Sequence, residues 1–120
     1  MGELTDYIAS LAEPTRSLLD RYRARAVALV PQAEEGTSYG MPALRYRGRP
    51  LIAIRVTKAG YSAYPFSSDV VADVCARFAG LNATKGGIRF TDRAPLPDEV
   101  YDALVAGRRQ EIDAALSRGR

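Results

Sequence analysis

The sequence contains no histidine, and its only cysteine is Cys75. Without histidine, the chain has no Ser-His or Cys-His nucleophile pair, no histidine general base and no ligand set for most zinc and haem sites. A single cysteine cannot form an internal disulfide bond, which is compatible with a reducing compartment. We therefore expect neither an enzyme nor a cofactor. Cys75 lies among apolar residues and is expected to be a small buried hydrophobe.

Long apolar runs are also missing. No stretch approaches the roughly 20 apolar residues that a membrane-spanning helix requires, and residues 1–6 show neither the basic nor the apolar segment of a signal peptide. These observations predict a cytoplasmic protein that does not bind a membrane. The length of 120 residues, with 47% hydrophobic and 26% charged residues, predicts one globular domain over residues 1–120.

The first quarter of the sequence has the pattern of two helices. Residues 4–11 form a short helical segment, and Pro14 suits the first turn of a second helix, where its missing N–H would have no partner. Apolar residues then recur three or four positions apart, which is the spacing of one helical face. They are Leu18, Leu19, Tyr22, Ala26, Leu29 and Val30. Pro31 ends this helix.

Residues 34–65 have the pattern of an antiparallel β-meander. Because glycine and proline favour turns, we expect turns at Gly40-Met41-Pro42, Gly48-Arg49-Pro50 and Lys58-Ala59-Gly60. The connections are short, so consecutive strands are expected to pair in antiparallel fashion. The predicted strands are residues 34–39, 43–47, 51–57 and 61–65.

A third helix should follow the meander. Ser67 or Ser68 is a good N-cap residue, and Gly80 is expected to end the helix. Its buried face is predicted to hold Val71, Val74, Cys75 and Phe78. We expect a turn over residues 82–87 and a short strand over residues 88–90.

Pro97 is expected to open the final helix. The apolar side of this helix is predicted to hold Val100, Leu104, Ile112 and Leu116. The resulting order α-β-β-β-β-α-β-α predicts an α+β fold, in which an antiparallel sheet of about five strands carries the helices on one face.

Several short motifs resemble the YdhG-like family of small bacterial domains. The strongest are SYGMPAL at residues 38–44 and RGRPL at residues 47–51. Further agreement comes from DYI at 6–8 with EP at 13–14, TKG at 84–86 before IRF at 88–90, and PLP at 95–97. The resemblance implies a fold similar to the type III secretion-chaperone class. The family is catalogued as a domain of unknown function, and part of it is described as an intracellular frataxin-like iron chaperone.

The meander contains a cluster of aromatic residues. Tyr39, Tyr46, Tyr61 and Tyr64 fall within it, and Phe66 and Phe90 are nearby. Tyrosines on neighbouring strands can form the floor of a site for a small ligand or a peptide, but aromatic residues also simply fill the face of a sheet. We predict a non-enzymatic binding or chaperone-like protein. Its candidate ligand-binding residues are Tyr39, Met41, Pro42, Tyr61, Tyr64 and Lys85.

Lys85 stands beside glycines, where a lysine and exposed N–H groups can hold an anion. The same glycines are more typical of a turn into the next strand. The segment lacks the spacing of a phosphate-binding Walker A loop.

The resemblance also implies an iron-donor alternative, in which clustered carboxylates bind iron. Glu34 and Glu35 are the candidate metal ligands, with Asp69 or Asp73 as further possibilities. A net charge of +3 argues against an acidic ridge that gathers iron. A second alternative is a structural homodimer formed through a sheet edge or the final helix.

The basic residues of the predicted sheet raise the question of nucleic-acid binding. A basic sheet face with tyrosines can bind single strands through phosphate contacts and stacking, but the sequence has no RNP-like aromatic motif and no helix-turn-helix signal. We therefore expect these arginines to form a solvated strand face, and nucleic acid is not an expected partner. The residues are Arg45, Arg47, Arg49, Arg55 and Arg89.

Overall fold

The computed structural model describes residues 2–58 and 60–118. Four helices are seen in these residues: α1 (Glu3–Ala9), α2 (Thr15–Leu29), α3 (Ser68–Arg77) and α4 (Asp98–Arg118). The strands are β1 (Glu34–Ser38), β2 (Met41–Tyr46), β3 (Arg49–Thr57), β4 (Gly60–Tyr64), β5 (Asn82–Ala83) and β6 (Ile88–Phe90). No helix in the described part of the chain is long and apolar enough to cross a membrane.

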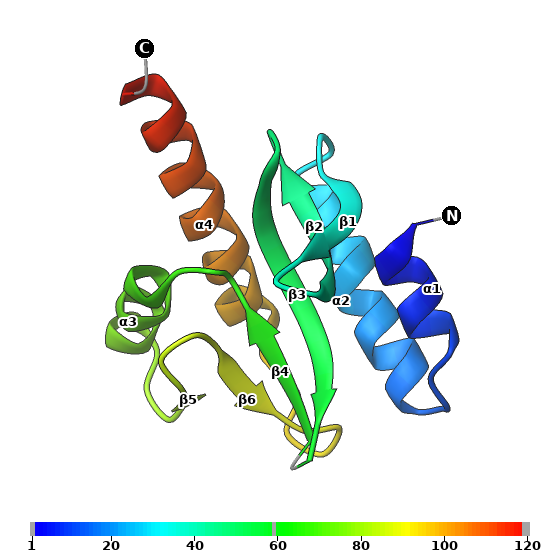
Figure 1. Cartoon of the computed structure of the whole chain (residues 1–120). Coiled ribbons are helices and arrows are strands. Elements are labelled where there is room, and N and C mark those ends of the chain that lie inside the picture. The colour runs from blue at the N-terminus through cyan, green and yellow to red at the C-terminus, as the bar shows by residue number, and fades with distance from the viewer. Residues whose placement is uncertain (1, 59, 119–120) are drawn as a thin grey trace.

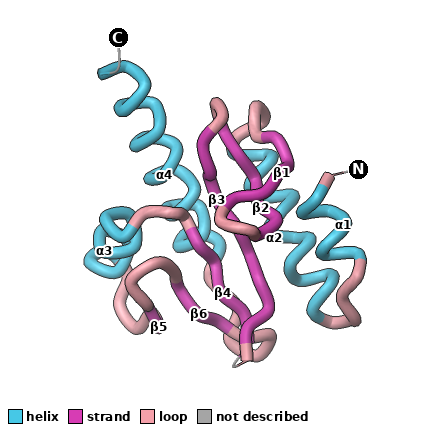
Figure 2. The backbone as a smooth tube through the Cα atoms, in the orientation of Figure 1, coloured by secondary structure: helices cyan, strands magenta, loops and turns pink. Residues whose placement is uncertain are grey.

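The strands form one antiparallel sheet in the order β1-β2-β3-β4-β6-β5. Figure 1 shows the sheet in front of α2 and α4. Helix α1 packs against β1 and β2, α2 and α4 pack against β3, and α3 packs against α4. The tube in Figure 2 shows that the helices leave the near face of the sheet uncovered. The predicted α+β class, with helices on one face of an antiparallel sheet, is confirmed.

The core lies between the helices and the covered face of the sheet. Alternate residues of the strands point into it, and they meet the apolar sides of α1, α2 and α4. The largest fully buried side chains are Tyr22, Tyr101, Leu4, Leu19, Leu44, Leu51, Ile52, Ile54, Ile88, Leu104, Ile112 and Val30. The predicted helical stripes therefore mark the core in part, because Leu18, Cys75, Phe78 and Leu116 are only partly buried against it and Leu29 is 37% exposed at the end of α2.

Two of the turns begin one residue earlier in the structure than the predicted turns at residues 40–42 and 48–50. The hairpin loops are Tyr39-Gly40 and Arg47-Gly48, all four with positive φ. Two-residue hairpin loops need this conformation because it matches the twist of the strands, and glycine adopts it without strain. Pro42 and Pro50 therefore lie inside strands. Pro50 is accommodated where the register between β2 and β3 shifts at Leu44/Arg45.

Further differences concern the second half of the chain. Residues 82–87 were expected to be a turn, but Asn82 and Ala83 pair with β6 and make a sixth strand. Helix α3 ends at Arg77, before Gly80, because Phe78 already has extended backbone angles. Gly60 begins β4, and Ala59 of the predicted turn lies outside the described residues. Ser67 is the N-cap of α3, as predicted, and its hydroxyl accepts a hydrogen bond from the Val70 N–H.

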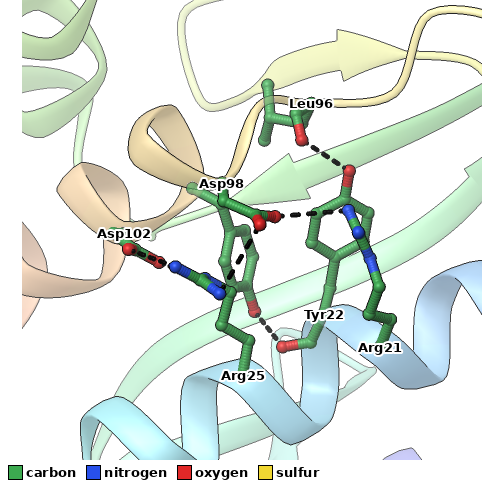
Figure 3. A network of polar contacts seen from close by, with 7 residues as sticks. Arg21, Tyr22, Arg25, Leu96, Asp98 and Asp102 are labelled. Atoms are coloured by element: carbon green, nitrogen blue, oxygen red, sulfur yellow. Dashed lines mark hydrogen bonds and ion pairs between the residues drawn. The ribbon is translucent and has the colours of Figure 1, made fainter.

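A polar network ties α2 to the start of α4 (Figure 3). The Tyr22 hydroxyl donates to the Leu96 carbonyl at 2.7 Å, and the Tyr101 hydroxyl donates to the Tyr22 carbonyl at 2.8 Å. Arg25 makes two hydrogen bonds to the Asp102 carboxylate, at 2.6 and 2.8 Å. Burial raises the pKa of Tyr101 and of Tyr22, because the charged phenolate would lose its hydration. This side of the protein is therefore both apolar and fully hydrogen-bonded at its centre.

Candidate ligand-binding site

A hollow of about 410 Å³ lies where the β1–β2 hairpin, the end of β4 and the loop between β5 and β6 meet. It opens on the uncovered side of the protein, away from the helical core. Its lining residues are Tyr39, Met41, Tyr64, Phe66, Ser67, Ser68, Lys85 and Gly86. We call this feature the aromatic hollow. Four of the predicted ligand-binding residues, Tyr39, Met41, Tyr64 and Lys85, are brought together in it.

Two aromatic rings from different segments stack at the hollow. Tyr39 is 85% exposed at the tip of the β1–β2 hairpin, and its ring lies 5.9 Å from the ring of Phe66 with an angle of 19° between the planes. Both residues have positive φ, 53° for Tyr39 and 57° for Phe66. That conformation is unfavourable for bulky residues and is often found at functional sites. At Tyr39 this conformation belongs to the two-residue hairpin loop, whereas Phe66 follows β4 and no hairpin loop accounts for its positive φ.

Tyr64 is held in place by the loop before β6. A Cβ added to Gly87 would lie 2.7 Å from the Tyr64 ring and 2.6 Å from the Ala63 carbonyl. Only glycine allows such close approach of the loop to β4. The same loop carries Lys85, which is exposed and forms no ion pair with another described residue. The ring of Tyr64 and the side chain of Lys85 therefore line the same hollow.

Tyr61 and Pro42 are not part of the aromatic hollow. Tyr61 is 8% exposed and lies in the core, where its hydroxyl is 2.7 Å from the Thr15 hydroxyl. It pairs with Phe90 of β6, and the two rings are 5.5 Å apart. Pro42 pairs with Thr37 within the sheet. For Tyr61 the second interpretation of the tyrosine cluster, filling of the sheet face, is therefore the correct one.

Phe66, Ser67, Ser68 and Gly86 line the hollow without having been predicted to do so. Phe66 was noted in the sequence only as a neighbour of the tyrosine cluster. Its role depends on the bend that follows β4, where a positive φ turns the chain toward Tyr39. No residue pattern in this segment predicts that bend, because phenylalanine rarely adopts a positive φ.

Glu34 and Glu35 do not come together as a carboxylate pair. They are adjacent on β1, so their side chains point to opposite faces of the sheet. The Glu35 carboxylate accepts hydrogen bonds from the N–H and the hydroxyl of Thr5 in the first turn of α1. Glu34 pairs in register with Arg45 on the uncovered face.

The two aspartates of α3 are also separate from these residues. Asp73 forms an ion pair with Arg77 at 3.5 Å, and Asp69 is exposed in the first turn of the helix. Within residues 2–58 and 60–118, no group of three or more His, Cys, Asp or Glu residues is arranged to hold a metal ion. Cys75 is half-buried and packs against the core.

The predicted basic residues divide between two environments. Arg47 forms an ion pair with Asp113 of α4 at 3.0 Å, and Arg45 donates to the Gly48 carbonyl at 2.6 Å. Arg55 and Arg89 lie on the uncovered face, opposite Ser62 of β4 in the register. Neither forms an ion pair with a described carboxylate. The Nε atoms of Arg45 and Arg55 are buried without a hydrogen-bond partner.

Comparison with known proteins finds similarity to solved structures but not to a family model. No protein-family model matches the sequence, and no curated protein matches it. The crystal structure of YdhG from Bacillus subtilis, described as a protein of the DUF1801 family, is similar with a TM-score of 0.72 and 18% sequence identity. The similarity covers 86% of this chain and 85% of that chain. At this identity it shows the fold and supports the resemblance seen in the sequence motifs: this protein has a YdhG-like α+β fold.

Proposed function

We propose that this protein is a non-enzymatic binding or chaperone-like protein that recognises a small ligand, or a side chain of an extended peptide, in the aromatic hollow. The observation that carries the proposal is the stacked pair of Tyr39 and Phe66. The Tyr39 ring is 85% exposed and so gives up the free energy that burial of its apolar surface would provide, and Phe66 has a positive φ that no hairpin loop requires. A role in binding gives a reason for such an arrangement.

The lining residues indicate what kind of group would bind. A planar or apolar group would pack between Tyr64 and the Tyr39–Phe66 pair, since aromatic rings contribute large contact areas and stack on other rings. Met41 would adapt to the shape of that group because its side chain is flexible and unbranched. Lys85 would attract a negative charge at the rim. The hollow offers tyrosine, methionine, phenylalanine, serine and lysine, and with no histidine in the sequence it has no ordinary general base.

The proposal is tested by titrating the protein with p-cresol, a neutral aromatic probe, while the backbone amide signals are followed by NMR. We expect saturable shifts at Met41, Phe66 and Gly86. Replacement of the Tyr39 ring in Tyr39→Ala should weaken binding at least about fivefold, as expected for the loss of a stacking contact worth about 1 kcal/mol. Lys85→Ala should leave this neutral probe unaffected.

Leu29→Ala is the matched control, because it also removes an exposed apolar side chain but lies at the end of α2. It should bind p-cresol like the unmodified protein. Equal binding by Tyr39→Ala and Leu29→Ala would show that the aromatic hollow is not a binding site. The homodimer alternative stays a prediction, and the mass of the protein in solution tests it.

A further inference from the structure

The charges on the two sides of the sheet are unequally neutralised. Arginines of α2, α3 and α4 form ion pairs with carboxylates, as Arg25 does with Asp102 and Arg108 with Glu111. On the uncovered face, the cations near the aromatic hollow have no carboxylate partner among the described residues. They are Arg55, Lys58, Lys85 and Arg89. Unneutralised positive charge on one face favours an anionic partner.

A second hollow lies beside the aromatic one on this basic face. It has a volume of about 450 Å³ and is lined by Thr57, Lys58, Ser62, Tyr64, Thr84 and Arg89. Tyr64 lines both hollows and is their common wall. No carboxylate lines either of them. We call the second feature the basic hollow.

Ser62 is the key residue of the basic hollow. It is 3% exposed, and apart from tyrosines it is the one polar residue that is buried among the described residues. It is also a lining residue of the hollow, and no hydrogen bond joins its hydroxyl to another described side chain or backbone group. Arg55 and Arg89 flank it in register on the neighbouring strands β3 and β6. The buried donor without a partner at this place is the Nε of Arg55, opposite Ser62 on β3, and leaving such a group unpaired is costly unless something binds nearby.

We propose that the basic hollow binds the phosphate group of a ligand whose planar part lies in the aromatic hollow. A phosphate monoester carries a charge of about −1.5 to −2 at pH 7 and three acceptor oxygens. Arg89 and Lys58 supply charge, the Ser62 hydroxyl donates a hydrogen bond from the floor, and Arg55 adds positive charge from the next strand. This inference rests on the proposed function, because it names the class of ligand for the same site: a small organic phosphate with a planar group.

The experiment compares adenosine 5′-monophosphate with adenosine as probes, measuring affinity by calorimetry and location by amide NMR. We expect the monophosphate to bind at least about tenfold more tightly, because charge-assisted hydrogen bonds to phosphate contribute about 1.5–3 kcal/mol. Arg89→Gln should remove most of that difference and leave adenosine binding unchanged. Ser62→Ala, which removes only a hydroxyl, should reduce monophosphate affinity about threefold to tenfold.

Arg49→Gln is the matched control, since Arg49 is exposed at the start of β3, has no ion pair among the described residues and carries the same charge. Its affinity for the monophosphate should change less than twofold. Equal affinity for both probes, an equal effect of Arg49→Gln and Arg89→Gln, or no binding of either probe would overturn the inference. If adenosine alone shifts Met41 and Gly86, the aromatic hollow binds and only the phosphate assignment is wrong. If the monophosphate depends on Arg89 but not on Tyr39, the proposed function is wrong instead.

Discussion

The two faces of the sheet differ in which groups pack on them and in whether their polar side chains have partners within the protein. On the covered face, apolar strand residues pack against three helices, and the buried hydroxyls of Tyr22 and Tyr101 donate to backbone carbonyls. On the uncovered face, Ala53 is opposite Tyr64 and Arg55 is opposite Ser62, and Arg55 has no carboxylate partner among the described residues. The covered face therefore accounts for most of the stability of the fold. The uncovered face carries the two hollows that we propose bind a ligand.

The largest effect is expected where neighbouring residues of β3 point to opposite faces. Ile54 is fully buried in the core, and Arg55 follows it on the uncovered face. Ile54→Ala should lower the free energy of unfolding by about 2–5 kcal/mol, because it leaves a cavity. Arg55→Gln should change it by only about 0.5 kcal/mol. Urea denaturation measures both, and similar losses would mean that the two faces contribute equally to stability.

A smaller effect should come from the loop that holds Tyr64. Gly87→Ala would place a Cβ 2.6 Å from the Ala63 carbonyl, which cannot move without disturbing β4. We expect a loss of about 1–3 kcal/mol, with altered amide signals around the aromatic hollow. Gly86→Ala is the control, because no atom lies within 4 Å of the added Cβ. If both variants are equally stable, the close packing of the loop on Tyr64 is not what fixes the hollow.

The hydroxyl of Tyr101 should make stability depend on alkaline pH. Burial raises its pKa in the folded protein, so above about pH 10 the unfolded chain loses a proton that the folded protein keeps. The contribution of this hydroxyl to the free energy of unfolding is therefore fully present below about pH 10. It falls as the pH rises further, by up to about 1.4 kcal/mol per pH unit. Tyr101→Phe should be less stable at pH 7 by about 1 kcal/mol but should show a shallower decline. Denaturation between pH 8 and 12 gives both slopes, and parallel slopes would contradict this explanation.

Much of the fold was predictable from the sequence because the helices carry apolar stripes and short turn segments separate the strands. The stripe of α2 marks part of the core that the structure shows. The turns were less predictable. In YGMP and RGRP, glycine and proline compete for the turn, and positive φ at Tyr39 and Arg47 decides where each hairpin closes.

The candidate site was predicted in part, and the error has a physical cause. Tyr61 and Tyr64 are three positions apart on one strand, so they must face opposite sides of the sheet. Because side chains alternate between the two faces of a strand, Tyr61 and Tyr64 can be assigned to opposite faces from the sequence: Tyr61 lies in the core, and Tyr64 lines the aromatic hollow. The contribution of Phe66 could not be predicted, because it depends on an unusual backbone bend rather than on residue type.

The smallest expected effect separates the two acidic residues of β1. Glu35 lies on the covered side and accepts hydrogen bonds from Thr5 at the start of α1. A negative charge at this end of a helix also interacts favourably with the helix dipole. Glu35→Gln should therefore lower stability by about 0.5–1 kcal/mol. Glu34→Gln, on the exposed side, should change it by less than about 0.5 kcal/mol.

The same pair tests the iron alternative, which stays a prediction. Anaerobic calorimetric titration with ferrous iron measures whether the protein binds the metal and whether Glu34→Gln or Glu35→Gln removes binding. Because adjacent strand residues face opposite sides, one ion can contact both carboxylates only if β1 twists or Glu35 leaves Thr5. Joint binding should then be accompanied by changed amide signals in α1. Micromolar binding that needs both residues but leaves α1 unchanged would contradict the assignment of Glu34 and Glu35 to opposite faces.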